Sequence, residues 1–211
     1  MIELTPMERD ALCEILNIAV SHAATALSEM AHEPIDLSVP RLQLYSREQA
    51  RTALDSRTGA VATGVHQTFH GAFNGVSLLV FPELDSYALV QRVIGNAVNL
   101  TDISELEQDA LLEVGNLILT SCLGSMADSF HCQLSNTLPT SQHGKASVMI
   151  EALGRNDEVD HTVLLVEVNF RLRQSDIAGY VVLILDMPAL ERVRELLGQF
   201  LDRIGKEPGT A

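Results

Sequence analysis

Six polar residues of this chain form two triplets of the same composition and spacing. The triplets are Asp10, Glu14 and Asn17 and, further along, Asp109, Glu113 and Asn116. On an α-helix, an i, i+4, i+7 spacing places three side chains on one face about two turns long. A carboxylate in this position can pair with a cation, and a carboxamide can donate and accept hydrogen bonds and so hold a water molecule. A merely solvated helix face is the alternative for either triplet alone, but asparagine is a mediocre helix former and recurs here at the same register.

The triplets belong to an internal repeat, because each residue of the second stands 99 positions after its counterpart in the first. The same offset relates three further pairs, which are Thr5 with Ser104, Glu8 with Glu107 and Pro40 with Pro139. The pairs Thr5 with Glu8 and Ser104 with Glu107 match the capping box that starts a helix. Apolar residues follow each box at helical spacing. We therefore predict two long amphipathic helices, over about 5–30 and 104–130, with both triplets facing solvent.

The residue patterns of the remaining chain predict strands and shorter helices. Strands are predicted over 60–69, 75–81, 147–152, 162–172 and 179–185. Phe81-Pro82 and Met187-Pro188 introduce helices that end near Gly95 and Gly198, and 41–58 is predicted to be a surface loop with a short helix. Neither half alone would bury both faces of its strands. We expect one domain over 1–205, built from two repeats of about 5–99 and 104–201, with a frayed tail over 206–211.

Composition restricts the possible partners. Twenty-eight acidic against 14 basic residues give a net charge of −14, which disfavours nucleic acid and anionic lipid. The three cysteines form no CxxC pair, and two of them, Cys13 and Cys122, lie in apolar helical stretches typical of inert thiols. His66 and His70 are too far apart on a strand to favour a metal site. The first residues do not resemble a signal peptide and no apolar window reaches the length of a membrane span, so we expect a soluble, cytoplasmic protein.

The pattern D-x3-E-x2-N-x22-P occurs twice, from Asp10 to Pro40 and from Asp109 to Pro139. It resembles the twin active-site signature of the CheC family of chemotaxis phosphatases, which includes CheC, CheX and FliY types. The segments 23–28 and 113–116 also resemble the family, and the likeness extends over about 5–200. It implies an α+β fold of pseudo-two-fold symmetry in which two long helices lie side by side on a mostly antiparallel sheet. The sequence departs from the family at 18–22, where glycine-containing steps are usual.

The resemblance also implies an activity, which is hydrolysis of the aspartyl phosphate of a CheY-like response regulator. Asn17 and Asn116 would each position an attacking water, and Glu14 and Glu113 would pair with the lysine of the regulator. Asp10 and Asp109 would support docking. No cofactor of its own is implied, because the regulator would supply Mg²⁺.

Two other functions are compatible with this family. The chain could dock a response regulator or a flagellar switch component without hydrolysis, or it could act as an adaptor for a CheD-like receptor deamidase. Both Glu/Asn pairs are present, which favours catalysis over docking alone. Because the duplication already supplies two sites, a monomer is expected.

Overall fold

Two long helices begin the two halves of the chain. A computed structural model describes residues 4–94, 105–153, 161–171 and 176–205. Helix α1 (Pro6–Ala31) starts at the predicted capping box, in which Thr5 Oγ1 accepts from the Glu8 backbone N–H at 3.2 Å and Glu8 accepts from that of Thr5 at 2.7 Å. Helix α4 (Glu105–Phe130) confirms the second long helix. Its predicted box begins at Ser104, which lies outside the described residues, as does the predicted tail 206–211.

One antiparallel sheet contains the seven strands of the described chain. In chain order they are β1 (Asp36–Ser46), β2 (Ala62–Gly71), β3 (Gly75–Pro82), β4 (Leu134–Asn136), β5 (Thr140–Gly144), β6 (His161–Arg171) and β7 (Asp176–Asp186). The spatial order is β1-β6-β7-β3-β2-β4, and β5 also pairs with β2. Strand β1 of the first half therefore pairs with β6 of the second, while β4 and β5 of the second half pair with β2 of the first. Each half thus completes the sheet of the other.

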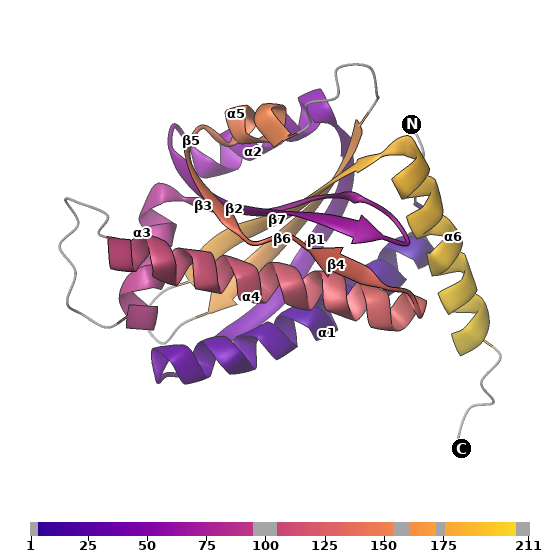
Figure 1. The fold of residues 1–211 in the computed structure, drawn as a ribbon, viewed down its shortest axis with the longest axis horizontal. Coiled ribbons are helices and arrows are strands. Elements are labelled where there is room, and N and C mark those ends of the chain that lie inside the picture. Colours follow the sequence, from indigo (N-terminus) through magenta and orange to yellow (C-terminus); the bar gives the residue numbers. More distant parts are fainter. Residues whose placement is uncertain (1–3, 95–104, 154–160, 172–175, 206–211) are drawn as a thin grey trace.

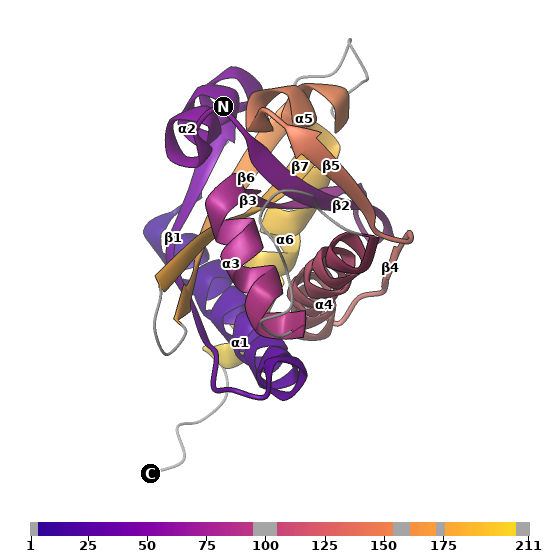
Figure 2. The same ribbon diagram turned by 90° about the vertical axis from the view of Figure 1, so that its left-hand side faces the viewer.

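Helices cover both faces of this sheet. Helices α1, α4, α3 (Glu83–Ile94) and α6 (Met187–Ile204) lie on one face, and α2 (Arg47–Thr58) and α5 (Ala146–Leu153) lie on the other (Figures 1 and 2). Successive side chains of a strand point to opposite faces. On β3, Leu79 and Phe81 accordingly join the core beneath the long helices, while Leu78 and Val80 join the core beneath α2 and α5.

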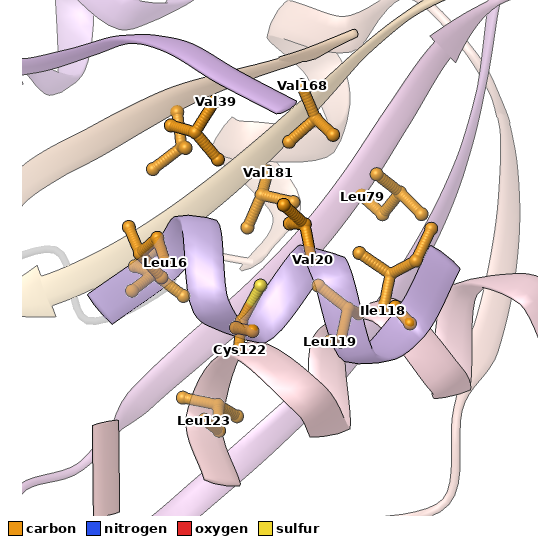
Figure 3. Close-up of a cluster of buried hydrophobic side chains, with 14 of the residues drawn as sticks. Leu16, Val20, Val39, Leu79, Ile118, Leu119, Cys122, Leu123, Val168 and Val181 are labelled. Atoms are coloured by element: carbon orange, nitrogen blue, oxygen red, sulfur yellow. The ribbon is translucent and has the colours of Figure 1, made fainter. Parts of the chain in front are cut away.

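The larger core is packed where α1 and α4 lie side by side on the sheet. Figure 3 shows Val20 of α1, Val181 of β7 and three residues of α4, Ile118, Leu119 and Cys122, all of them buried in this core. Burial raises the pKa of the Cys122 thiol to about 12, so this cysteine stays protonated and packs as a small apolar residue. Burial of these residues holds the two helices that bear the triplets in one layer.

Both long helices also reach the length and mean hydropathy of a membrane span. The segments are Pro6–Ala31 and Gln108–Phe130, with hydropathies of 1.3 and 1.4. By this criterion the expectation that no segment reaches span length is wrong. The apolar residues of both helices are those that pack on the sheet and on each other, and core helices pass the same test. Burial therefore accounts for their apolarity.

Some predictions of secondary structure are wrong in whole or in part. The predicted strand over 147–152 lies within helix α5, which buries Ala146, Met149 and Ile150 at helical spacing. Its Ser147 N–H donates at 2.9 Å to Asp55 of α2, a partner 92 positions away that the local sequence does not reveal. The surface loop with a short helix predicted over 41–58 is correct in its helix, which is α2, but the residues before that helix belong to strand β1, and α2 buries Ala50 and Leu54. Helix α6 also continues past Gly198 to Ile204.

Candidate functional site

The first triplet lies on the exposed edge of α1. The side chains of Asp10 and Glu14 are exposed, whereas that of Asn17 is half-buried. Asn17 Oδ1 accepts a hydrogen bond of 2.9 Å from the backbone N–H of Val39, and its Nδ2 lies 3.8 Å from Cys13 Sγ. The Asn17 carboxamide is therefore engaged at both ends by its own protein.

A bulge in β1 makes this contact possible. The register between β1 and β6 shifts between Ser38 and Arg41. A bulge leaves a residue unpaired in the ladder, and the N–H of Val39 turns to Asn17. The Val39 side chain is only 4% exposed, so this part of β1 packs closely against α1.

Cys13 completes the surroundings of Asn17. Its thiol donates to the Val39 carbonyl at 3.5 Å. Partial burial raises the pKa of Cys13, and the carboxylates of Asp10 and Glu14 raise it further. The thiol is therefore protonated at neutral pH and acts here as a weak hydrogen-bonding group.

The second triplet has the same exposure but different partners. The side chains of Asp109 and Glu113 are exposed, and that of Asn116 is half-buried. Asn116 Oδ1 accepts 2.7 Å and 3.3 Å hydrogen bonds from Gln67 Nε2 of β2 and Thr120 Oγ1 of α4. Within the described part of the chain, Asn116 Nδ2 has no hydrogen-bond partner. One end of this carboxamide is therefore held while the other is free.

A groove of about 510 Å³ opens beside Asn116. Gln67, Asn116 and Thr120 line it together with Leu138 and Pro139 of the segment that joins β4 to β5. Leu138 is 87% exposed, in contrast to Val39, its counterpart 99 positions earlier. In the first half a groove of about 650 Å³ runs from Ser21 to Leu37, and Asn17 is not among its lining residues. Only the second groove thus brings its asparagine to the opening.

The asparagines differ from the prediction in one respect. Both triplets were expected to face solvent, and the four carboxylates do, but each carboxamide lies at the junction of helix and sheet. The strand partners of the two asparagines, Val39 and Gln67, were missed because they lie 22 and 49 positions away. One signal was available for Gln67, since it stands between Val65 and Phe69 on the face of β2 that points to the core.

The described side chains of the site can bind a partner and orient a water molecule. In the described ranges, no group of three or more His, Cys, Asp or Glu side chains is placed to hold a metal ion. What each triplet offers is an exposed carboxylate one turn from a carboxamide. Such a pair can dock a cation with the acid and hold a water with the amide.

Comparisons with known proteins point to one family. Residues 7–43 match the model of the CheC-like family. CheY-P phosphatase CheC of Bacillus subtilis is 24% identical over 200 residues, which are 92% of this chain and 95% of that protein. Flagellar motor switch phosphatase FliY of the same organism is 26% identical over 177 residues, 83% of this chain but only 45% of FliY. The crystal structure of Thermotoga maritima FliY superposes with a TM-score of 0.76 at 19% identity and covers 94% of this chain and all of that one.

Proposed function

We propose that this chain is a member of the CheC-like family and a cytoplasmic phosphatase that hydrolyses the aspartyl phosphate of a CheY-like response regulator. The similarity to CheY-P phosphatase CheC over nearly the full length of both chains is the observation that supports this most directly. The paired Glu and Asn on α1 and on α4 add a chemical reason for it.

In the proposed reaction, a water molecule attacks the phosphorus and the bond from phosphorus to the aspartyl oxygen breaks. The products are inorganic phosphate and the free aspartate of the regulator, and the proton of the water passes to the phosphate. The regulator would supply Mg²⁺ and a lysine, which neutralise charge on the phosphoryl group. The carboxamide of Asn17 or Asn116 would hold the water in line with the bond that breaks.

The glutamates would set the docking position. Glu14 and Glu113 are exposed and lie one turn from their asparagines, where they can pair with the regulator's lysine. Asp10 and Asp109 lie one turn further out and would extend the same contact. Because the net charge of −14 repels phosphorylated surfaces in general, recognition would depend on these local contacts.

The test is a timed assay of phosphate release from a phosphorylated CheY-like receiver. We expect the chain to accelerate release, and the double variant Asn17→Ala, Asn116→Ala to abolish the acceleration while still binding the receiver. Glu48→Gln, an exposed glutamate on the opposite face of the sheet, serves as the control and keeps the full rate. Binding of the phosphorylated receiver with no acceleration by the unaltered chain would instead support a docking module.

A further inference from the structure

Gln67 occupies a position that has a counterpart in the other half of the sheet. Residues that are 99 positions apart in the repeat pair with equivalent residues of the sheet. Thr140 pairs with His66, and its counterpart Arg41 pairs with Glu167. In the same way, Asn136 pairs with Phe69, and its counterpart Leu37 pairs with Phe170. Both comparisons relate β2 to β6 by 101 positions. The counterpart of Gln67 is therefore Val168, which is fully buried and cannot form a side-chain hydrogen bond (Figure 3).

The hydrogen bonds around the two asparagines differ because the equivalent positions of the two halves carry different side chains. Around Asn116, Asn136 Nδ2 donates to Thr120 Oγ1 at 3.4 Å, and Thr120 and Gln67 both donate to Asn116 Oδ1. Around Asn17, the three equivalent positions hold Leu37, Ser21 and Val168. Ser21 Oγ donates to the Asn17 backbone carbonyl at 2.8 Å instead of to its side chain. Within the described residues, this network of amide and hydroxyl side chains surrounds Asn116 and has no equivalent around Asn17, whose side-chain partner is Cys13.

A glutamine at position 67 lowers the stability of the fold. It is only 1% exposed, and within the described chain its Oε1 is buried without a hydrogen-bond partner. Leaving a buried polar atom unpaired destabilises a fold. The equivalent valine shows that the architecture accepts an apolar side chain there. Stability alone thus favours an apolar residue, and the contact with Asn116 is the structural consequence of having glutamine.

The backbone of Gln67 is held firmly enough to orient its side chain. It lies in the middle of β2 between β3 and the β4–β5 edge, and Ser77 Oγ of β3 donates to its carbonyl at 3.3 Å. A side chain packed in a strand has fewer conformations than one in a loop, so its amide is a fixed donor. Asn116 Oδ1 is held by Gln67 of the sheet, and Asn116 lines the groove.

We propose that Gln67 is a positioning residue that fixes the carboxamide of Asn116, and that the second site carries most of the turnover. This inference rests on the proposed phosphatase function. Asn17 lacks the arrangement, because Val39 holds its Oδ1 and Cys13 lies at its Nδ2. At the second site the free Nδ2 meets the attacking water in one orientation, so less conformational freedom is lost in the transition state.

The experiment compares Gln67→Met, which has a similar volume but no amide, in two backgrounds. With Asn17→Ala, where only the second site remains, we expect kcat to fall roughly ten- to a hundredfold while KM is unchanged. With Asn116→Ala, where only the first site remains, the same substitution should leave the small residual rate as it was. The melting temperature of Gln67→Met should equal or exceed that of the unaltered chain. A merely structural role would lower stability and rate together.

A nuclear magnetic resonance measurement keeps the inference separate from the activity. The side-chain amide signals of Asn116, assigned by their loss in Asn116→Ala, should move toward those of a freely rotating amide in Gln67→Met. Unchanged signals with unchanged kcat would overturn the role of Gln67, even if the chain is a phosphatase. Equal rates for Asn17→Ala and Asn116→Ala would overturn the dominance of the second site. If the chain has no phosphatase activity, the proposed function is wrong. The side-chain amide signals of Asn116 would then still test whether Gln67 positions its carboxamide.

Discussion

Gly115 on α4 lies so close to Val65 on β2 that a Cβ atom added to Gly115 would stand 2.5 Å from the Cβ of Val65. Only a residue without a side chain permits this approach of helix to strand. Asn116 follows Gly115, and Gln67 follows Val65 by two positions on the same face of β2. The close approach therefore sets the 2.7 Å bond between the two amides.

Gly115→Ala should lower stability and activity together. The added methyl group has to push α4 away from β2, and such overpacking costs about 1–3 kcal/mol. The shift would also lengthen the Gln67–Asn116 bond, so we expect a lower kcat from the second site. Denaturant unfolding and the phosphate-release assay measure the two effects.

Gly198→Ala is the matched control for that substitution. Gly198 lies within α6, and a Cβ there would meet no atom within 4 Å. Replacing glycine in an open helix position stabilises the helix by about 0.5–1 kcal/mol. Stabilisation by both substitutions would show that α4 and β2 are not closely packed at Gly115.

The asparagine variants should differ in stability. Asn17→Ala removes the acceptor for the Val39 N–H, a loss of about 0.5–1.5 kcal/mol. Asn116→Ala leaves both polar atoms of the buried Gln67 without a partner in the described chain, which costs about 1–3 kcal/mol. Adding Gln67→Met to Asn116→Ala should recover part of that loss. If denaturation midpoints show no recovery, the buried amide pair does not interact as the structure indicates.

Leu138 should contribute to docking. It is 87% exposed at the rim of the groove beside Asn116, and an exposed leucine at such a site can be buried by a partner. We expect Leu138→Ser to raise KM for the phosphorylated receiver several-fold without changing kcat or the melting temperature. Leu84→Ser on α3 is the control, because Leu84 is 78% exposed and does not line the groove. A similar rise in KM for both would mean that general surface hydrophobicity, and not this rim, governs docking.

The parts of the fold that follow from local sequence were predicted well. The capping box at Thr5 and the apolar spacing behind it located α1, and strands such as β3 and β7 have continuous apolar runs bounded by turn residues or charges. The triplets were found because they repeat at one offset. The capping box and the apolar runs are encoded within short segments, and the repeat of the triplets appears on comparing the sequence with itself.

The missed features depend on contacts between distant segments. Helix α5 is a short, largely apolar segment of eight residues that fits a strand or a helix equally, and its contact with Asp55 of α2 favours the helix. The features of the site also depend on distant segments. The difference between Gln67 and Val168 can be recognised only once β2 and β6 are known to be equivalent strands. Spacing along one helix could identify Asn17 and Asn116 but not what holds each amide.

His66 should make the protein less stable in mild acid. It lies on β2 opposite Thr140 of β5, half-buried, and burial lowers the pKa of its imidazole from the ordinary 6.5, while a hydrogen bond with the Thr140 backbone offsets part of that change. The unfolded chain then binds a proton at a higher pH than the folded chain, so stability is full above 6.5 and falls as the pH drops through the lowered pKa. We expect His66→Gln to remove part of the loss in melting temperature between neutral pH and mildly acidic pH. His70→Gln, four residues along the same strand at an exposed position, should retain the loss. A pH profile of His66→Gln that matches that of the unaltered chain would contradict the assignment and direct attention to the other histidines.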